Sequence, residues 1–104
     1  MSTCKNSNER FNRYKKILLE IIHEILPNCN VYLFGSRARC DHDQGSDIDL
    51  ALDCQKPIEL NKISQIKEKI EESIIPLFVD LVDIHTAGDT IKKEIKDEGI
   101  LWEK

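Results

Sequence analysis

The chain has 104 residues and a formal net charge of -4, with 40% hydrophobic and 33% charged residues. This length predicts one domain with one modest core and little room for a second lobe. The composition is typical of a globular protein, and the acidic balance argues against a generic nucleic-acid binder, which usually carries a basic surface.

The four cysteines include no Cys-x-x-Cys pair, and their spacing fits neither a zinc ribbon nor a disulfide scaffold. They are Cys4, Cys29, Cys40 and Cys54. The first third of the leading 30 residues is polar and charged, and no apolar run approaches a membrane span. We therefore expect a cytoplasmic protein with free, reduced thiols.

Residues 1–8 are polar and are expected to be a flexible N-terminus, and residues 9–104 are expected to form a single domain. From Glu9, apolar residues recur at three- and four-residue steps, which predicts an amphipathic helix that ends before Pro27. The stripe consists of Phe11, Tyr14, Ile17, Leu18, Ile21, Ile22 and Ile25.

Two strands are expected after this helix. Residues 31–34 form a β-branched and aromatic run that Gly35 stops, and residues 47–52 alternate acids with aliphatic residues. The segment between them, residues 36–46, is expected to contain a turn, one helical turn and a loop.

A second helix is expected from Pro57, which suits a first helical turn, to Pro76. Residues 77–84 then predict a third strand. The predicted core stripe of the helix is Leu60, Ile63, Ile66, Ile70 and Ile74.

Asp89 is expected to cap a last helix that runs through Lys96 and ends at Gly99. Ile91 and Ile95 should face inward. The apolar residues 100–102, with Trp102, belong either to the core or to an interface. The order of elements predicts an α+β fold, a small mixed β-sheet flanked by helices.

Asp47 and Asp49 lie two residues apart in a predicted strand, so their side chains should share one face. Adjacent carboxylates repel each other unless a cation lies between them, and Mg2+ prefers carboxylates together with substrate phosphates. For an isolated pair, two solvated acids on an exposed face would be the better interpretation.

Gly35 and Ser36 strengthen the metal interpretation. Glycine allows a sharp turn and a close backbone approach, and the N–H groups of a helical segment that Ser36 opens could meet phosphate oxygens. A simple turn between a strand and a loop is the alternative.

Asp80 lies among aliphatic residues in a strand that we expect to be central, where a carboxylate is costly unless it is paired or bound to a metal. If this strand neighbours residues 47–52, Asp80 joins the other two acids. Three acids around metal ions suit in-line phosphoryl or nucleotidyl transfer. By alternation Asp83 points to the opposite face.

Gly35-Ser36, ten further residues and then Asp47-x-Asp49 resemble the signature of the polymerase-beta-type nucleotidyltransferases. The resemblance extends to the minimal nucleotidyltransferase (MNT) subfamily and covers about residues 9–102. Cys40 stands where the family often has glycine, which puts the shape of that loop in doubt. The segments similar to the subfamily are residues 34–39, 45–51 and 79–83.

The resemblance implies a polymerase-beta-type fold and an enzyme that uses two Mg2+ ions, with Mn2+ as the alternative, and ATP as substrate. It implies Asp47, Asp49 and Asp80 as catalytic metal ligands. The residues expected to bind the nucleotide are Gly35, Ser36, Ser46 and Arg39. For Arg37 and Arg39, a phosphate or partner contact and a solvated surface charge remain open.

Many relatives carry a further helical domain that grips the acceptor, and this chain has no room for one, so we expect a partner to supply it. The resemblance implies transfer of AMP to a tyrosine hydroxyl of a helical HEPN-type toxin, for which the chain is the antitoxin. No membrane and no direct nucleic-acid contact are expected. Two alternatives remain: a weak or inactive nucleotide-binding module that neutralises the toxin by contact, and a nucleotidyltransferase for a small molecule or an RNA end.

Overall fold

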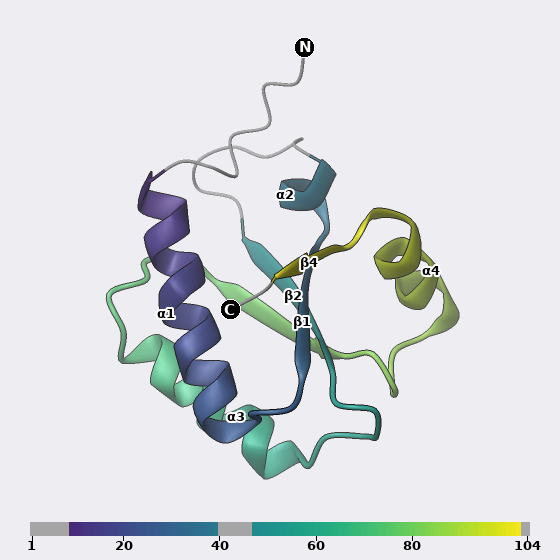
Figure 1. The fold of residues 1–104 in the computed structure, drawn as a ribbon, viewed down its shortest axis with the longest axis horizontal. Coiled ribbons are helices and arrows are strands. Elements are labelled where there is room, and N and C mark those ends of the chain that lie inside the picture. Colours follow the sequence, from purple (N-terminus) through teal and green to yellow (C-terminus); the bar gives the residue numbers. More distant parts are fainter. Residues whose placement is uncertain (1–8, 40–46, 103–104) are drawn as a thin grey trace.

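The computed structural model describes residues 9–39 and 47–102, in which one four-stranded mixed sheet has helices on both faces (Figure 1). The strand order is β3-β2-β1-β4, in which β1 runs antiparallel to β2 and β4 while β2 and β3 are parallel. The predicted α+β class is confirmed. The elements are α1 (Glu9–Ile25), β1 (Asn30–Phe34), α2 (Ser36–Arg39), β2 (Ile48–Asp53), α3 (Leu60–Glu71), β3 (Val79–Asp83), α4 (Asp89–Glu98) and β4 (Ile100–Trp102).

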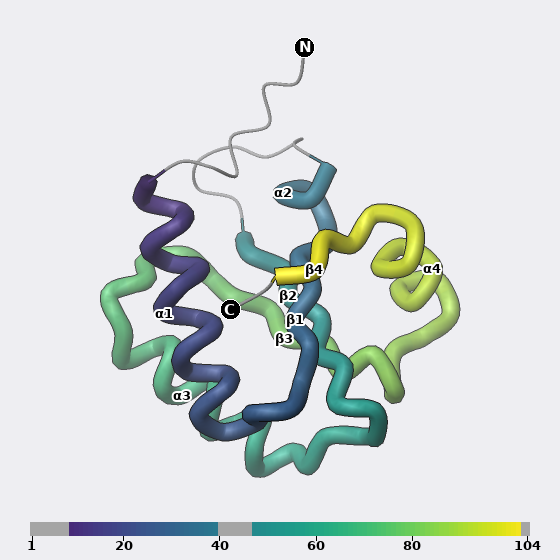
Figure 2. The backbone as a smooth tube through the Cα atoms, in the orientation of Figure 1, coloured from purple at the N-terminus to yellow at the C-terminus, as the bar shows by residue number. Residues whose placement is uncertain are grey.

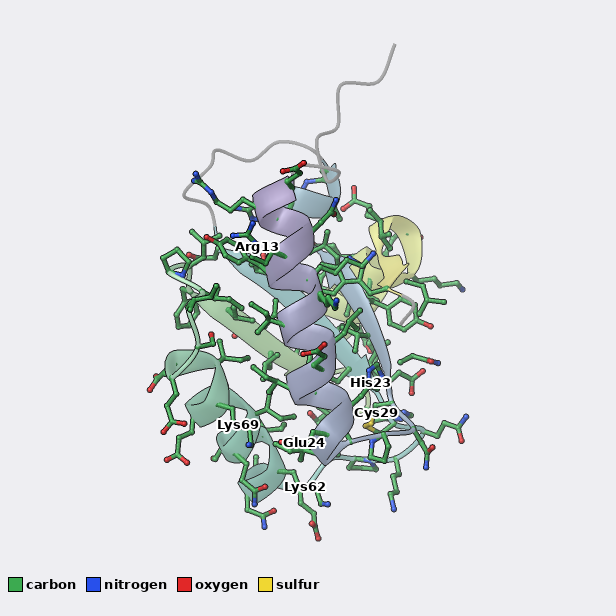
Figure 3. All side chains as sticks on the ribbon, turned by 60° about the vertical axis from the view of Figure 1, so that its left-hand side comes forward. Arg13, His23, Glu24, Cys29, Lys62 and Lys69 are labelled. Atoms are coloured by element: carbon green, nitrogen blue, oxygen red, sulfur yellow. A yellow bond between two sulfur atoms is a disulfide. The ribbon has the colours of Figure 1, made fainter. Side chains whose placement is uncertain are left out.

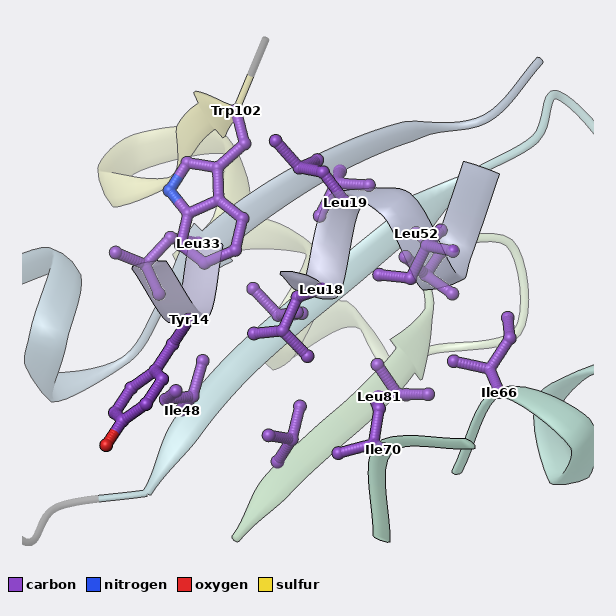
Figure 4. Close-up of a cluster of buried hydrophobic side chains, with 14 of the residues drawn as sticks. Tyr14, Leu18, Leu19, Leu33, Ile48, Leu52, Ile66, Ile70, Leu81 and Trp102 are labelled. Atoms are coloured by element: carbon purple, nitrogen blue, oxygen red, sulfur yellow. The ribbon is translucent and has the colours of Figure 1, made fainter. Parts of the chain in front are cut away.

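Different helices cover the two faces of the sheet (Figure 2). Helices α1 and α3 cover one face, where Leu18, Ile48 and Ile66 are fully buried in the main core (Figure 4). On the other face α4 brings Ile95 against Phe34 and Ala51 to form a smaller cluster. Because neighbouring strand residues alternate between faces, β2 sends its even-numbered leucine and isoleucine side chains into the main core and its acids to the α4 side.

Helix α1 has the predicted bounds. Four residues of the predicted stripe are buried and the other three, Ile17, Ile21 and Ile25, are partly buried against the core, while Leu19 is buried without having been predicted. An exposed ion pair between Glu24 and Lys69, with 3.0 Å between Oε1 and Nζ, joins it to α3 (Figure 3). None of the helices in the described ranges has the length and apolar character that crossing a membrane requires.

The second predicted helix is too long at both ends. Helix α3 begins at Leu60, and Pro57 lies before it, because the backbone N–H of Ile58 donates to Asp83 and holds this segment against β3. Ile66 and Ile70 are buried as predicted, but Leu60 is 81% exposed and Ile74, beyond the helix, is 67% exposed. The prediction that these two belong to the core is wrong.

Residues 100–102 form a fourth strand that the sequence did not predict. β4 pairs with β1, placing Trp102 opposite Val31. The Trp102 side chain is 4% exposed, and its ring meets that of Phe11 edge-on with 5.9 Å between centroids. Of the two interpretations of this segment, Trp102 therefore belongs to the core. At the preceding helix, Asp89 is the first helical residue, and Gly88 occupies the cap position.

The expectation of free thiols is wrong for two of the cysteines. Cys29 and Cys54 form a disulfide with 4.2 Å between their Cα atoms. The cause is the register of β1 and β2, in which Asn30 pairs with Asp53. Continuing this register by one residue beyond the strand ends places Cys29 opposite Cys54. Spacing along the chain could not reveal this pair. Cys4 and Cys40 lie outside the described residues.

The burial of Trp102 predicts that β4 is needed for stability. Trp102→Ala should lower the free energy of unfolding by about 3–5 kcal/mol, because a large buried ring is lost and a cavity is left. Chemical denaturation followed by circular dichroism measures this change. Leu101→Ala, at a 46% exposed position of the same strand, should cost less than about 1 kcal/mol. Equal losses in the two variants would contradict the assignment of Trp102 to the core.

Candidate active site

The turn between β1 and α2 is built around Gly35, which has a φ of 78°. Its carbonyl accepts hydrogen bonds from the N–H groups of Ala38 and Arg39, so α2 starts directly at Ser36. A Cβ at position 35 would overlap Oδ2 of Asp49. Glycine is therefore required twice here, for the left-handed backbone and for room beside the carboxylate. This close approach to an acid of the candidate site was not part of the sequence prediction.

Two of the three predicted acids meet across β2 and β3. Asp49 and Asp80 are direct partners in the parallel register. Both side chains are half-buried and lie on the face opposite the buried Ile48 and Val79. Asp47 is exposed and lies one residue before β2. The expectation of a central strand for Asp80 is wrong, because β3 is the edge strand of the sheet.

Asp49 has a raised pKa. Burial raises its pKa, and the neighbouring charges of Asp80, Asp47 and Glu94 raise it further, while Arg39 acts in the opposite direction. Burial and like charges both disfavour the ionised carboxylate. A cation among these carboxylates would relieve the repulsion. In the described ranges, however, no three His, Cys, Asp or Glu side chains are gathered closely enough to hold a metal ion.

Arg37 and Arg39 occupy different environments. Arg37 is 4% exposed, with its guanidinium carbon 5.0 Å from the centroid of the Phe11 ring. Burial lowers the pKa of Arg37, and the charge of Asp47 opposes that change. A solvated surface charge is therefore the wrong interpretation for Arg37, whose position ties α2 to α1.

Arg39 connects α2 to α4. Its Nη1 lies 3.1 Å from Oε2 of Glu94 and 3.2 Å from Oε1 of Glu98. The guanidinium side chain remains 38% exposed, so it stays accessible beside the acids. Glu94 was missed in the sequence, because no short motif connects a residue of α4 with Asp49. Ser46, predicted to bind the nucleotide, lies outside the described residues.

Asp83 has a structural role on the opposite face, as the alternation of the strand predicted. It is 7% exposed and accepts hydrogen bonds from the N–H groups of Ile58, at 2.8 Å, and His85, at 3.0 Å. One carboxylate oxygen thus fixes the segment before α3, and the other fixes the turn after β3. β3 therefore carries one acid for the site and one for the fold.

The family model described as "Polymerase beta, Nucleotidyltransferase" matches residues 8–103. The chain belongs to this nucleotidyltransferase family. Its Gly35-Ser36 turn and its Asp47, Asp49 and Asp80 are thus the candidate active site of a nucleotidyltransferase.

This nucleotidyltransferase is similar to proteins named for protein adenylylation. It is 31% identical over 80 residues to the probable protein adenylyltransferase MntA of Haemophilus influenzae, covering 77% of this chain and 70% of that protein. It is also 28% identical over 102 residues to a Methanocaldococcus jannaschii protein named as a protein adenylyltransferase, covering 98% of this chain and 99% of the relative.

Solved structures share the fold at lower sequence identity. A structure described as a toxin-antitoxin with AMP-PNP superimposes with a TM-score of 0.72 at 22% identity, covering 86% of this chain and 73% of that one. An MNT antitoxin in complex with a tri-AMPylated Shewanella oneidensis HEPN toxin gives a TM-score of 0.69 at 20% identity, covering 89% and 72%. These likenesses support the minimal nucleotidyltransferase fold of the chain.

The contact between Gly35 and Asp49 predicts that Gly35→Ala damages both fold and site. A left-handed alanine costs about 1–2 kcal/mol, and its methyl group must also displace the Asp49 carboxylate. Thermal unfolding and a nucleotide-transfer assay measure the two effects. Gly88→Ala is the matched control, since an added Cβ there meets nothing within 4 Å. Equal loss of stability and activity in the two variants would refute the proposed contact.

The raised pKa of Asp49 predicts that Asp49→Asn stabilises the protein at neutral pH. Above its raised folded-state pKa, ionised Asp49 destabilises the native state, and the neutral amide removes that cost. The stability difference between Asp49→Asn and wild type should shrink as pH falls through this pKa, because folded Asp49 then takes up a proton. Denaturation of both proteins across a pH series measures it.

Asp53→Asn is the control on the same strand, because the pKa of Asp53 is lowered whereas that of Asp49 is raised. Hydrogen bonds from the Gln55 N–H and His85 lower the pKa of Asp53, so its ionised form stabilises the fold and that contribution is lost as pH falls through the lowered pKa. Asp53→Asn should therefore be less stable than wild type at neutral pH. If Asp49→Asn is less stable than wild type at neutral pH, ionised Asp49 does not destabilise the fold, and the prediction is wrong.

Proposed function

We propose that this nucleotidyltransferase transfers AMP from ATP to a hydroxyl group, that of a tyrosine, on a HEPN-type helical toxin and thereby acts as its antitoxin. The observation that carries the proposal is the pairing of Asp49 with Asp80 beside the Gly35-Ser36 turn. The similarity to proteins named as protein adenylyltransferases supports AMP as the transferred group and a protein as the acceptor.

The acids fit Mg2+ as the cofactor by their chemistry. Burial raises the pKa of Asp49, and the neighbouring carboxylates of Asp80, Asp47 and Glu94 raise it further. Such an oxygen-rich, mutually repelling set suits a hard cation. Asp47 and Asp49 would hold both ions and Asp80 one. When bound, Mg2+ neutralises phosphate charge and makes the acceptor hydroxyl more acidic.

The reaction is an in-line displacement at the α-phosphorus of ATP. The acceptor oxygen forms a bond to this phosphorus, the bond to the bridging α,β-oxygen breaks, and pyrophosphate leaves. Gly35 and Ser36 position the triphosphate through backbone N–H groups and the Ser36 hydroxyl, and Asp80 draws the proton from the acceptor hydroxyl. Arg39 and Ser46 contact the phosphates, which for Arg39 requires exchange of its bonds to Glu94 and Glu98.

A second candidate is a binding module that neutralises the toxin by contact, with weak or no catalysis. Neutralisation by contact alone would require neither a metal ion nor the three acids. The two candidates differ in one respect: only the enzyme changes the mass of its partner.

The deciding experiment is co-expression with the protein encoded next to this chain, followed by measurement of that neighbour's intact mass. The wild type should add one or more AMP units, and the Asp47→Asn, Asp49→Asn double variant should reduce the added AMP by at least about 100-fold, since charge stabilisation at the phosphates is lost. Unchanged mass with both proteins still co-purifying would favour the binding module. Wild-type transfer by Asp49→Asn alone would refute the proposed mechanism.

A further inference from the structure

An exposed aromatic residue lies close to the paired acids Asp49 and Asp80. Phe78 is 64% exposed, although it immediately precedes β3 and lies only two residues from Asp80. Its carbonyl accepts a hydrogen bond of 2.9 Å from the N–H of Ile48, so its backbone extends the pairing of β3 with β2. An exposed phenylalanine anchored in this way is a fixed apolar contact and not the tip of a long loop.

The pairing places Phe78 on the same face as the acids. Val79, the next residue, is 7% exposed and belongs to the main core. Side chains alternate along an extended strand, so Phe78 shares the opposite face with Asp80. Continuing the register of Ile48 with Val79 by one residue brings Phe78 beside Asp47.

The order of the strands gives the site two different sides. The Gly35-Ser36 turn follows β1, whereas Phe78 and Asp80 lie on β3, on the other side of β2. In an in-line displacement the attacking and leaving oxygens lie on opposite sides of the phosphorus. If pyrophosphate leaves at the Gly35-Ser36 turn, the acceptor oxygen must approach from the side of β3 (Figure 2). Phe78 immediately precedes that strand.

We propose that Phe78 is a specificity-determining residue that packs against the polypeptide segment carrying the acceptor hydroxyl. This inference rests on the proposed function and adds the side from which the protein acceptor enters. An exposed ring beside a carboxylate suits an apolar or aromatic stretch of protein, which the ring can cover while Asp80 meets the hydroxyl. A nucleotide bound at the α2 side would not touch it.

The test is steady-state kinetics of Phe78→Ala with ATP and with the protein encoded next to this chain as acceptor. The KM for the acceptor should rise by about 10- to 100-fold, as for the loss of an aromatic anchor at an interface, while the KM for ATP stays within about twofold. Phe78→Tyr should restore most of the acceptor affinity, because the ring is kept. The exposure of Phe78 leaves the fold intact in these variants, which circular dichroism checks.

Leu60→Ala is the matched control, because Leu60 is an 81% exposed apolar residue at the start of α3, away from the acids. It should leave both KM values unchanged. An unchanged acceptor KM in Phe78→Ala would overturn the inference, and so would a rise in the KM for ATP, which would place the ring on the nucleotide.

A binding measurement separates a failure of the proposed function from a failure of the docking role of Phe78. If wild type transfers no AMP yet binds the neighbouring protein, the Kd measured without ATP replaces the KM. Weaker binding by Phe78→Ala alone would then support a docking role, and equal binding would overturn it. A wild type that neither modifies nor binds that protein would overturn both proposals.

Discussion

The candidate site depends on the contact between the Gly35 backbone and the Asp49 carboxylate. β1 and β2 pair with Phe34 opposite Asp49, so the chain must turn directly above that acid to begin α2. Any side chain at position 35 would occupy the space of the carboxylate. The same glycine therefore lets the Gly35-Ser36 turn and the Asp49 carboxylate lie together, and both depend on the antiparallel pairing of β1 with β2.

The face on which each acid lies could be predicted from the sequence, because alternation along a strand requires no knowledge of its neighbours. Asp80 and Asp83 show how far this argument reaches. It separated the acid that meets Asp49 from the acid that holds Ile58 and His85. It could not place β3 at the edge of the sheet, since strand order depends on contacts between segments that are distant in the chain.

The other differences from prediction have the same origin. The pairing of Cys29 with Cys54 follows from the register of β1 and β2. Strand β4 forms because the apolar residues 100–102 pair with β1. Glu94 approaches Asp49 because α4 packs on the sheet. None of these depends on a local pattern. Helix α3 shows the converse: its stripe was correct at Ile66 and Ile70, but the hydrogen bond from Ile58 to Asp83 set where it begins.

The charges around Asp49 connect the fold with the proposed function. Burial and neighbouring like charges both disfavour the ionised form of Asp49, which lowers the stability of the fold. Arg39 offsets part of this cost, yet Glu94 and Glu98 hold it on the α4 side. A triphosphate with its metal ions would bring positive charge to the acids and negative charge to Arg39 at once. Under the proposed function, relief of the repulsion at Asp49 would therefore contribute to the free energy with which substrate and cation bind.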